Sequence, residues 1–108
     1  MPYYMIQMAY AGEAWAAQVQ NPQDRTEAIR AVVEELGGRL VGRWFCFGEY
    51  DSVLITEMPD NVSAAAQAII ASAGGGPKAF KTTPLLTVEE GTEALRKAGS
   101  SGYRPPGG

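Results

Sequence analysis

Strand-like and helix-like segments follow one another along this chain in an order that few folds accept. Segments rich in β-branched, aromatic and aliphatic side chains cover residues 2–10, 39–47, 52–58 and 79–86. Amphipathic helical segments cover residues 22–36, 61–73 and 88–98. The predicted order is therefore strand, helix, strand, strand, helix, strand and a final helix.

Local signals mark the ends of the helices. Asn21 is a suitable N-cap before Pro22, whose missing N–H costs nothing at the first helical position. The next helix can be capped by Asp60 or Asn61, and Thr87 with Glu90 forms the pattern of a capping box before the last one. The apolar stripes predicted to face the core are Ile29, Val32, Val33 and Leu36 in the first helix, and Val62, Ala65, Ala66, Ile69, Ile70 and Ala73 in the second.

This order is the split βαβ arrangement of the ferredoxin-like fold, an α+β architecture with a four-stranded antiparallel sheet. We expect one domain over residues 1–98 and a flexible tail rich in Gly, Ser and Pro over residues 99–108. Both main helices of this fold cover the same face of the sheet. The other face needs a cover, and a second copy of the chain is the simplest one. The sequence thus predicts a homodimer, or a larger assembly of dimers, joined through the open face.

The composition excludes several kinds of chemistry. The 108 residues include no histidine, so the commonest general base and imidazole metal sites are absent. The single cysteine, Cys46, excludes an internal disulfide and a CxxC pair. We expect no metal and no cofactor. The net charge of −3, with scattered basic residues, argues against nucleic-acid binding. No signal peptide or membrane span is recognisable, and a cytoplasmic protein is expected.

Strand parity predicts which residues face the helices. In the second strand Arg43 alternates with Trp44, and an unpaired arginine buried beneath a helix is costly. We therefore place Arg43 and Phe45 on the open, dimer-forming face, and Trp44 and Cys46 under the helices. Tyr4 belongs with the latter group because it lies on the bulkier face of the first strand, together with Ile6, Met8 and Tyr10. Any cavity is expected on the helix-covered side, next to Tyr4, Trp44 and Cys46.

Candidate ligand-binding residues are aromatic, thiol and carboxylate side chains, and each also has a structural interpretation. Tyr4, Trp15 and Trp44 can line an aromatic pocket, or simply fill the core. Cys46 can be a nucleophile beside a cation, but a small apolar core residue is the simpler interpretation. Tyr50 and Asp51 can supply an acid and a base; a role in holding the turn is favoured. Pro2 is a further candidate base, if Met1 is removed. The predicted site residues are Tyr4, Trp15, Trp44, Cys46, Tyr50 and Asp51.

Several short motifs together resemble the GYD-domain family of bacterial proteins within the dimeric α/β-barrel superfamily. They are the Tyr-rich first strand, Asn21-Pro22 with Arg25, Leu36-Gly37-Gly38, Gly48-Glu49-Tyr50-Asp51, Glu57-Met58-Pro59-Asp60 and Leu86-Thr87-Val88-Glu89-Glu90. The entry to the fourth strand, Gly76-Pro77-Lys78-Ala79, departs from the family pattern. The resemblance implies a dimeric barrel and carries no established activity. The superfamily includes monooxygenases and cyclases that work without metals.

Two functions remain open at this level. One is a small-molecule-binding protein or cofactor-independent enzyme with an aromatic pocket between sheet and helices. The other is a non-catalytic structural or oligomerisation module. A pocket would favour the first function, and a solid core the second.

Overall fold

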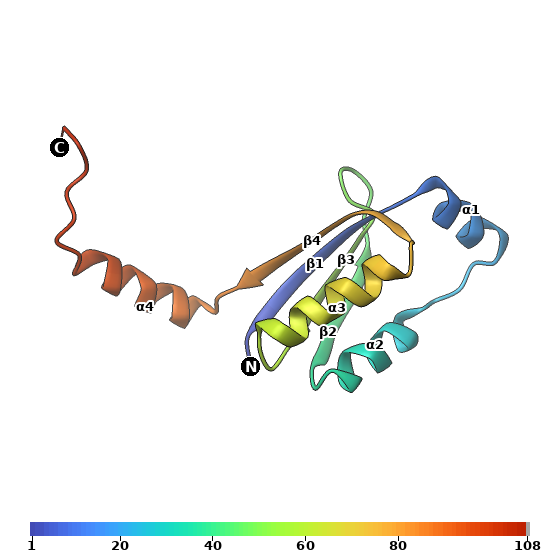
Figure 1. The fold of residues 1–108 in the computed structure, drawn as a ribbon, viewed down its shortest axis with the longest axis horizontal. Helices are drawn as coiled ribbons and strands as arrows, with labels where there is room; N and C mark the ends of the chain where they lie inside the picture. Colours follow the sequence, from blue (N-terminus) through green and yellow to red (C-terminus); the bar gives the residue numbers. More distant parts are fainter. Residues whose placement is uncertain (108) are drawn as a thin grey trace.

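A computed structural model describes residues 1–107 of the chain, and its elements follow the predicted order with one addition (Figure 1). The elements are β1 (Tyr3–Tyr10), α1 (Gly12–Gln20), α2 (Thr26–Glu35), β2 (Arg39–Phe45), β3 (Ser52–Glu57), α3 (Asn61–Ala73), β4 (Pro77–Leu85) and α4 (Val88–Gly99). The strands form one antiparallel sheet in the order β2-β3-β1-β4. This is the predicted ferredoxin-like α+β fold.

The core lies between the sheet and the two helices that cover one of its faces, α2 and α3 (Figure 1). It contains the apolar side chains that point from β1, β2 and β3 toward these helices, together with Val33 of α2 and Ala64 of α3. Leu54, Met58 and Val33 are fully buried. The predicted inward face of β1 is confirmed, because Tyr4 and Ile6 belong to this core.

The helix predicted to start at Pro22 begins four residues later. Asn21 closes α1 instead, since its N–H donates to the carbonyl of Ala17. The entry to α2 is held by Asp24, whose Oδ1 accepts from the backbone N–H of Thr26 at 2.9 Å. A proline disfavours helical backbone at the residue before it. The Asn21-Pro22 pair therefore separates two helices rather than opening one. The sequence patterns do not predict α1.

The inward face of α3 also differs from the prediction. Its N-cap is Asp60, as expected, with the side chain accepting from the N–H of Ser63 at 2.8 Å. However, Ala64 and Gln67 point to the core, while Val62 and Ile69 are 79% and 67% exposed. Alanine occurs on every side of this helix, so apolar periodicity does not select its buried face.

A β-bulge in β2 reverses the predicted parity of that strand. Leu40 lies opposite Thr56, but the next pair is Gly42 with Ile55, which leaves Val41 as an extra residue. One extra residue moves every following side chain to the other face of the sheet. Trp44, predicted to lie under the helices, is therefore on the open face, whereas Arg43 lies opposite Leu54 on the helix-covered face. Cys46, also predicted to lie under the helices, is beyond the last paired residue of β2. Phe45 is on the same helix-covered face as Arg43 and pairs with the buried Ser52.

The last helix extends beyond the sheet. The predicted capping box at its start is confirmed, with hydrogen bonds in both directions between Thr87 and Glu90. Figure 1 shows α4 projecting from the end of β4, away from α2 and α3, and none of its residues is buried. The predicted tail starts at residue 99, where this helix ends, and its last residue, Gly108, lies outside the described residues.

Candidate functional site

A cavity of about 520 Å³ lies on the helix-covered side of the sheet, among α1, α2 and α3. Its floor is formed by the inward side chains near the end of β1 and by Leu54 and Phe80 of the neighbouring strands. Most of its wall is aliphatic or aromatic: Ile6, Met8, Tyr10, Ala14, Ala17, Ala28, Ile29, Val32, Val33, Leu54, Ile70, Ala71 and Phe80. A cavity is thus present on the predicted side of the sheet, and its volume is within the range of about 300–1,000 Å³ common for ligand pockets.

Four polar side chains also line this cavity, and they come from different elements. Gln67 of α3 is almost fully buried, and Gln18 belongs to α1. Arg43 of β2 is the third, and its side chain is only 7% exposed. Arg25, at the N-cap of α2, adds a second guanidinium at the edge of the cavity.

The guanidinium of Arg43 is incompletely paired. Its Nη1 lies 4.0 Å from Oδ1 of Asp24, a carboxylate that is 82% exposed. Its Nη2 donates to the hydroxyl of Tyr10 at 3.4 Å, which is a long hydrogen bond. The buried Nε has no hydrogen-bond partner within residues 1–107. A buried cation with so few partners is costly.

Two neighbours hold Arg43 in position. Its Cζ lies 4.9 Å from the ring centroid of Phe45, a cation–π contact. Hydrogen bonds from the side chain and backbone of Thr26 lower the pKa of Asp24, and the charge of Arg43 adds to this effect. Asp24 therefore stays ionised next to Nη1 over the whole neutral range.

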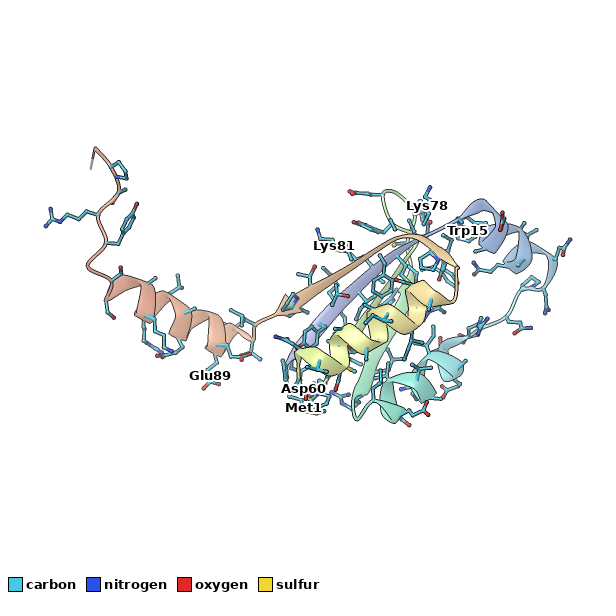
Figure 2. The ribbon with its side chains drawn as sticks, viewed as in Figure 1. Met1, Trp15, Asp60, Lys78, Lys81 and Glu89 are labelled. Carbon is cyan, nitrogen blue, oxygen red and sulfur yellow. The ribbon has the colours of Figure 1, made fainter. Side chains whose placement is uncertain are left out.

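A second, more open depression borders Arg43 from outside. This groove has a volume of about 650 Å³ and lies between α1, the connector to α2 and the edge strand β2. It contains Trp15 and Trp44 of the predicted site residues. Trp15, labelled in Figure 2, packs edge-to-face on Tyr10 with ring centroids 5.2 Å apart, and so joins α1 to the end of β1.

The other predicted site residues border neither the cavity nor the groove. Tyr4 is a core residue whose hydroxyl donates to Oδ1 of Asn61 at 2.5 Å. Cys46 lies beyond the end of β2, with Sγ 3.2 Å from the carbonyl oxygen of Tyr50. Asp51 accepts the N–H of Tyr10 through Oδ2 at 2.9 Å and donates its own N–H to Met8. These contacts connect the β2–β3 turn to the end of β1.

Sequence reasoning misses the polar residues that the fold brings together at the cavity. Strand parity assigns Arg43 to the wrong face, although a glycine inside a strand, here Gly42, is a known sign of a bulge. Gln67 carries no signal, because a glutamine in an alanine-rich helix is typical of a solvent-facing position. Tyr10 is placed on the correct face of β1 but is not among the predicted site residues.

The fold defines the class of protein first: a ferredoxin-like α+β domain with a four-stranded antiparallel sheet. The sequence then matches the model of the GYD domain over residues 4–95. Because this match spans most of the chain, the protein belongs to the GYD-domain family, as its motifs predicted. The search of curated proteins gave no match.

Two solved structures are similar to this chain at low sequence identity. TTHA0845 from Thermus thermophilus is 15% identical, with a TM-score of 0.53; the alignment covers 82% of this chain and 96% of that one. An uncharacterized NIPSNAP domain protein from Burkholderia xenovorans is also 15% identical, with a TM-score of 0.46, and the alignment covers 82% of this chain and 95% of that one. At this identity the first likeness supports the fold alone.

Two features are absent from residues 1–107. No three His, Cys, Asp or Glu side chains among them are grouped as metal ligands. No helix in this part of the chain has the length and apolar character needed to cross a bilayer.

Proposed function

We propose that this protein binds a small, largely apolar molecule in the cavity between the sheet and α1, α2 and α3, either as a binding protein or as an enzyme that needs no cofactor. The single observation that carries the proposal is the cavity itself, with about 520 Å³ of space behind a wall of aliphatic and aromatic side chains. A few converging polar groups within an apolar wall are typical of ligand sites.

Binding can be tested with N-phenyl-1-naphthylamine, a neutral apolar dye that fluoresces strongly when it leaves water. The full-length protein is expected to enhance its emission saturably. Ala71→Phe places a ring in the cavity and should abolish the effect. Ala73→Phe is the matched control, because Ala73 lies on the same helix, is exposed and does not line the cavity. Equal enhancement by both variants would contradict binding in this cavity, and no enhancement would show that the cavity does not accept a neutral apolar molecule.

Native mass spectrometry of the protein purified from its own host complements the dye experiment. It measures the copy number and any retained small molecule together. A mass increment of a few hundred daltons per chain that disappears in Ala71→Phe and persists in Ala73→Phe would identify the natural ligand by its mass. It would also provide the starting point for an enzymatic assay.

The second candidate function, a structural or oligomerisation module, is favoured by a different observation. The face of the sheet opposite α2 and α3 carries Met5, Val53, Ile55 and Trp44, and Trp44 is 55% exposed. Figure 2 shows Lys81, which belongs to the same face by its register, projecting from β4 away from α3. A homodimer joined through this face would cover these apolar side chains. Such a dimer is compatible with ligand binding on the opposite side of each sheet.

The dimer proposal is tested by sedimentation of matched variants. Trp44→Glu introduces a charge on the open face and is expected to shift the protein toward monomer at micromolar concentration. Phe45→Glu is the control, because the bulge places Phe45 on the other side of the sheet. A monomeric wild-type protein, or a stronger effect of Phe45→Glu, would exclude association through this face.

A further inference from the structure

We propose that the ligand of the cavity is an apolar monocarboxylate, and that Arg43 binds its carboxylate group. This inference rests on the proposed function, since it names the chemical class of the molecule that the cavity holds. It starts from a cation whose side chain is only 7% exposed and whose Nε lacks a partner within the described chain.

The free donors of Arg43 lie on one edge of the guanidinium. Nη1 is directed to Asp24, which lines the outer groove and not the cavity. Nη2 is directed to the hydroxyl of Tyr10, which lines the cavity, and the 3.4 Å separation leaves this hydrogen bond weak. Nε has no partner in residues 1–107. The Nε–Nη2 edge is the pair of parallel N–H donors that a carboxylate accepts in bidentate geometry.

The surroundings of this edge select for a single negative charge. Among the described residues that line the cavity there is no Asp or Glu, whereas Arg25 and Arg43 both border it. Asp24 compensates part of the charge of Arg43 from the groove side, so the site is not cationic enough to favour a dianion over a monoanion. Gln67, 8% exposed and also lining the cavity, can donate an N–H to the same ligand or to a polar group on it.

The remainder of the cavity specifies an apolar body. Ile6, Met8, Ile29, Leu54 and Phe80 line the same cavity as the guanidinium. These side chains offer no hydrogen bonds, so a ligand with polar groups along its length would lose hydration without compensation. A short fatty acid or an aromatic carboxylic acid has the required combination of one anionic end and an apolar remainder.

The test compares decanoate with decan-1-ol, which differ at the end that would meet Arg43. Each is titrated at neutral pH into the full-length protein with bound N-phenyl-1-naphthylamine, and displacement of the dye is measured. The wild-type protein is expected to bind decanoate about tenfold or more tightly than the alcohol, as suits a charge-assisted bidentate contact. Arg43→Met, which keeps an apolar chain as far as the position of Nε and removes the guanidinium charge, should remove the preference while the dye and the alcohol still bind.

Two further variants separate the role of Arg43 from unspecific effects. Arg39→Gln removes a different arginine, which is outside the cavity and paired with Glu57, and should leave the preference unchanged. Arg43→Lys keeps the charge but loses the pair of parallel N–H donors, and should retain only part of the preference. Circular dichroism and thermal unfolding establish that each variant is folded.

The outcomes distinguish this inference from the proposed function. If the dye binds and decanoate and decan-1-ol compete equally, or if Arg43→Met keeps the preference, the carboxylate proposal is wrong and the cavity remains a neutral apolar site. If the dye does not bind, thermal shift measures decanoate directly. A rise in Tm that needs Arg43 supports the inference, and no rise with either ligand overturns both proposals.

Discussion

The indole of Trp44 lies over Gly42 on the open face of the sheet, so close that a Cβ added at residue 42 would be 2.6 Å from Cη2 of the indole. The two residues share this face because the bulge at Val41 precedes both of them. The missing side chain of Gly42 therefore makes room for the ring of Trp44, rather than opening a pocket under the helices.

Gly42→Ala is expected to displace the indole of Trp44 into solvent. The contact is with the far end of a side chain that is already half-exposed, so the melting temperature should fall by only a few degrees. Fluorescence in a Trp15→Phe background reports Trp44 alone, and its emission maximum should move to longer wavelength. An unchanged maximum would mean that the ring does not rest on Gly42.

Asp51→Ala is expected to destabilise the domain, because Oδ2 of Asp51 accepts the backbone N–H of Tyr10. A lost hydrogen bond of this kind costs about 1 kcal/mol, which corresponds to about 4–8 °C in the melting temperature of a domain of this size. Asp51→Asn keeps an acceptor at the same position and should lose less. Differential scanning calorimetry checks both. If Asp51→Ala has the melting temperature of the wild-type protein but no longer binds the ligand, Asp51 has a functional role instead.

Tyr4→Phe is expected to lower the free energy of unfolding by about 1 kcal/mol through loss of the hydrogen bond to Asn61. Dye binding should not change, since Tyr4 does not line the cavity. A double-mutant cycle with Asn61→Ala, followed by urea denaturation, should give a coupling energy between the two side chains. Weakened binding of the dye by a folded Tyr4→Phe variant would indicate that Tyr4 contributes to the ligand site.

Acid is expected to weaken the N-terminus of α3 through Asp60. Hydrogen bonds from Ser63, first its backbone N–H and then its hydroxyl, hold the pKa of this exposed carboxyl below its ordinary value. A lowered pKa in the folded state gives stability that is present above the unfolded pKa and is lost as the pH falls through the folded pKa. Asp60→Asn still caps the helix but does not titrate. Its melting temperature should therefore fall less between neutral and acidic pH than that of the wild-type protein.

The order of elements, most of their bounds and two of the helix caps were predictable from the sequence. Asp60 and the pair Thr87 and Glu90 act on backbone groups no more than three residues away, so their patterns carry the structural information directly. The family was also predictable, because the motifs that indicate it are short and can be recognised in the sequence without the structure. The start of α2 was misplaced because Asn21 and Pro22 suit the end of one helix as well as the start of another.

The candidate site was predictable only in part. The cavity lies on the predicted side of the sheet and includes the predicted inward face of β1 near Tyr10, but none of the six predicted site residues lines it. Trp15 and Trp44 border the outer groove, and Tyr4 is in the core. The cavity residues that the sequence did not predict, Arg43 and Gln67, have polar side chains at buried positions. Polarity patterns assign such side chains to the surface rather than to a core.

The sequence by itself determined most of the local structure: where the strands and most of the helices lie, and how two of the helices are capped. It also determined that the chain belongs to the GYD-domain family. The tertiary structure alone decided which side chains of β2 and α3 face the core. In β2 that choice depends on Val41, because one extra residue relative to β3 turns Trp44 outward and Arg43 inward. The sequence period of a strand is unchanged by the bulge. Only pairing with a neighbouring strand and packing of the helices above it determine which of the two faces becomes the interior.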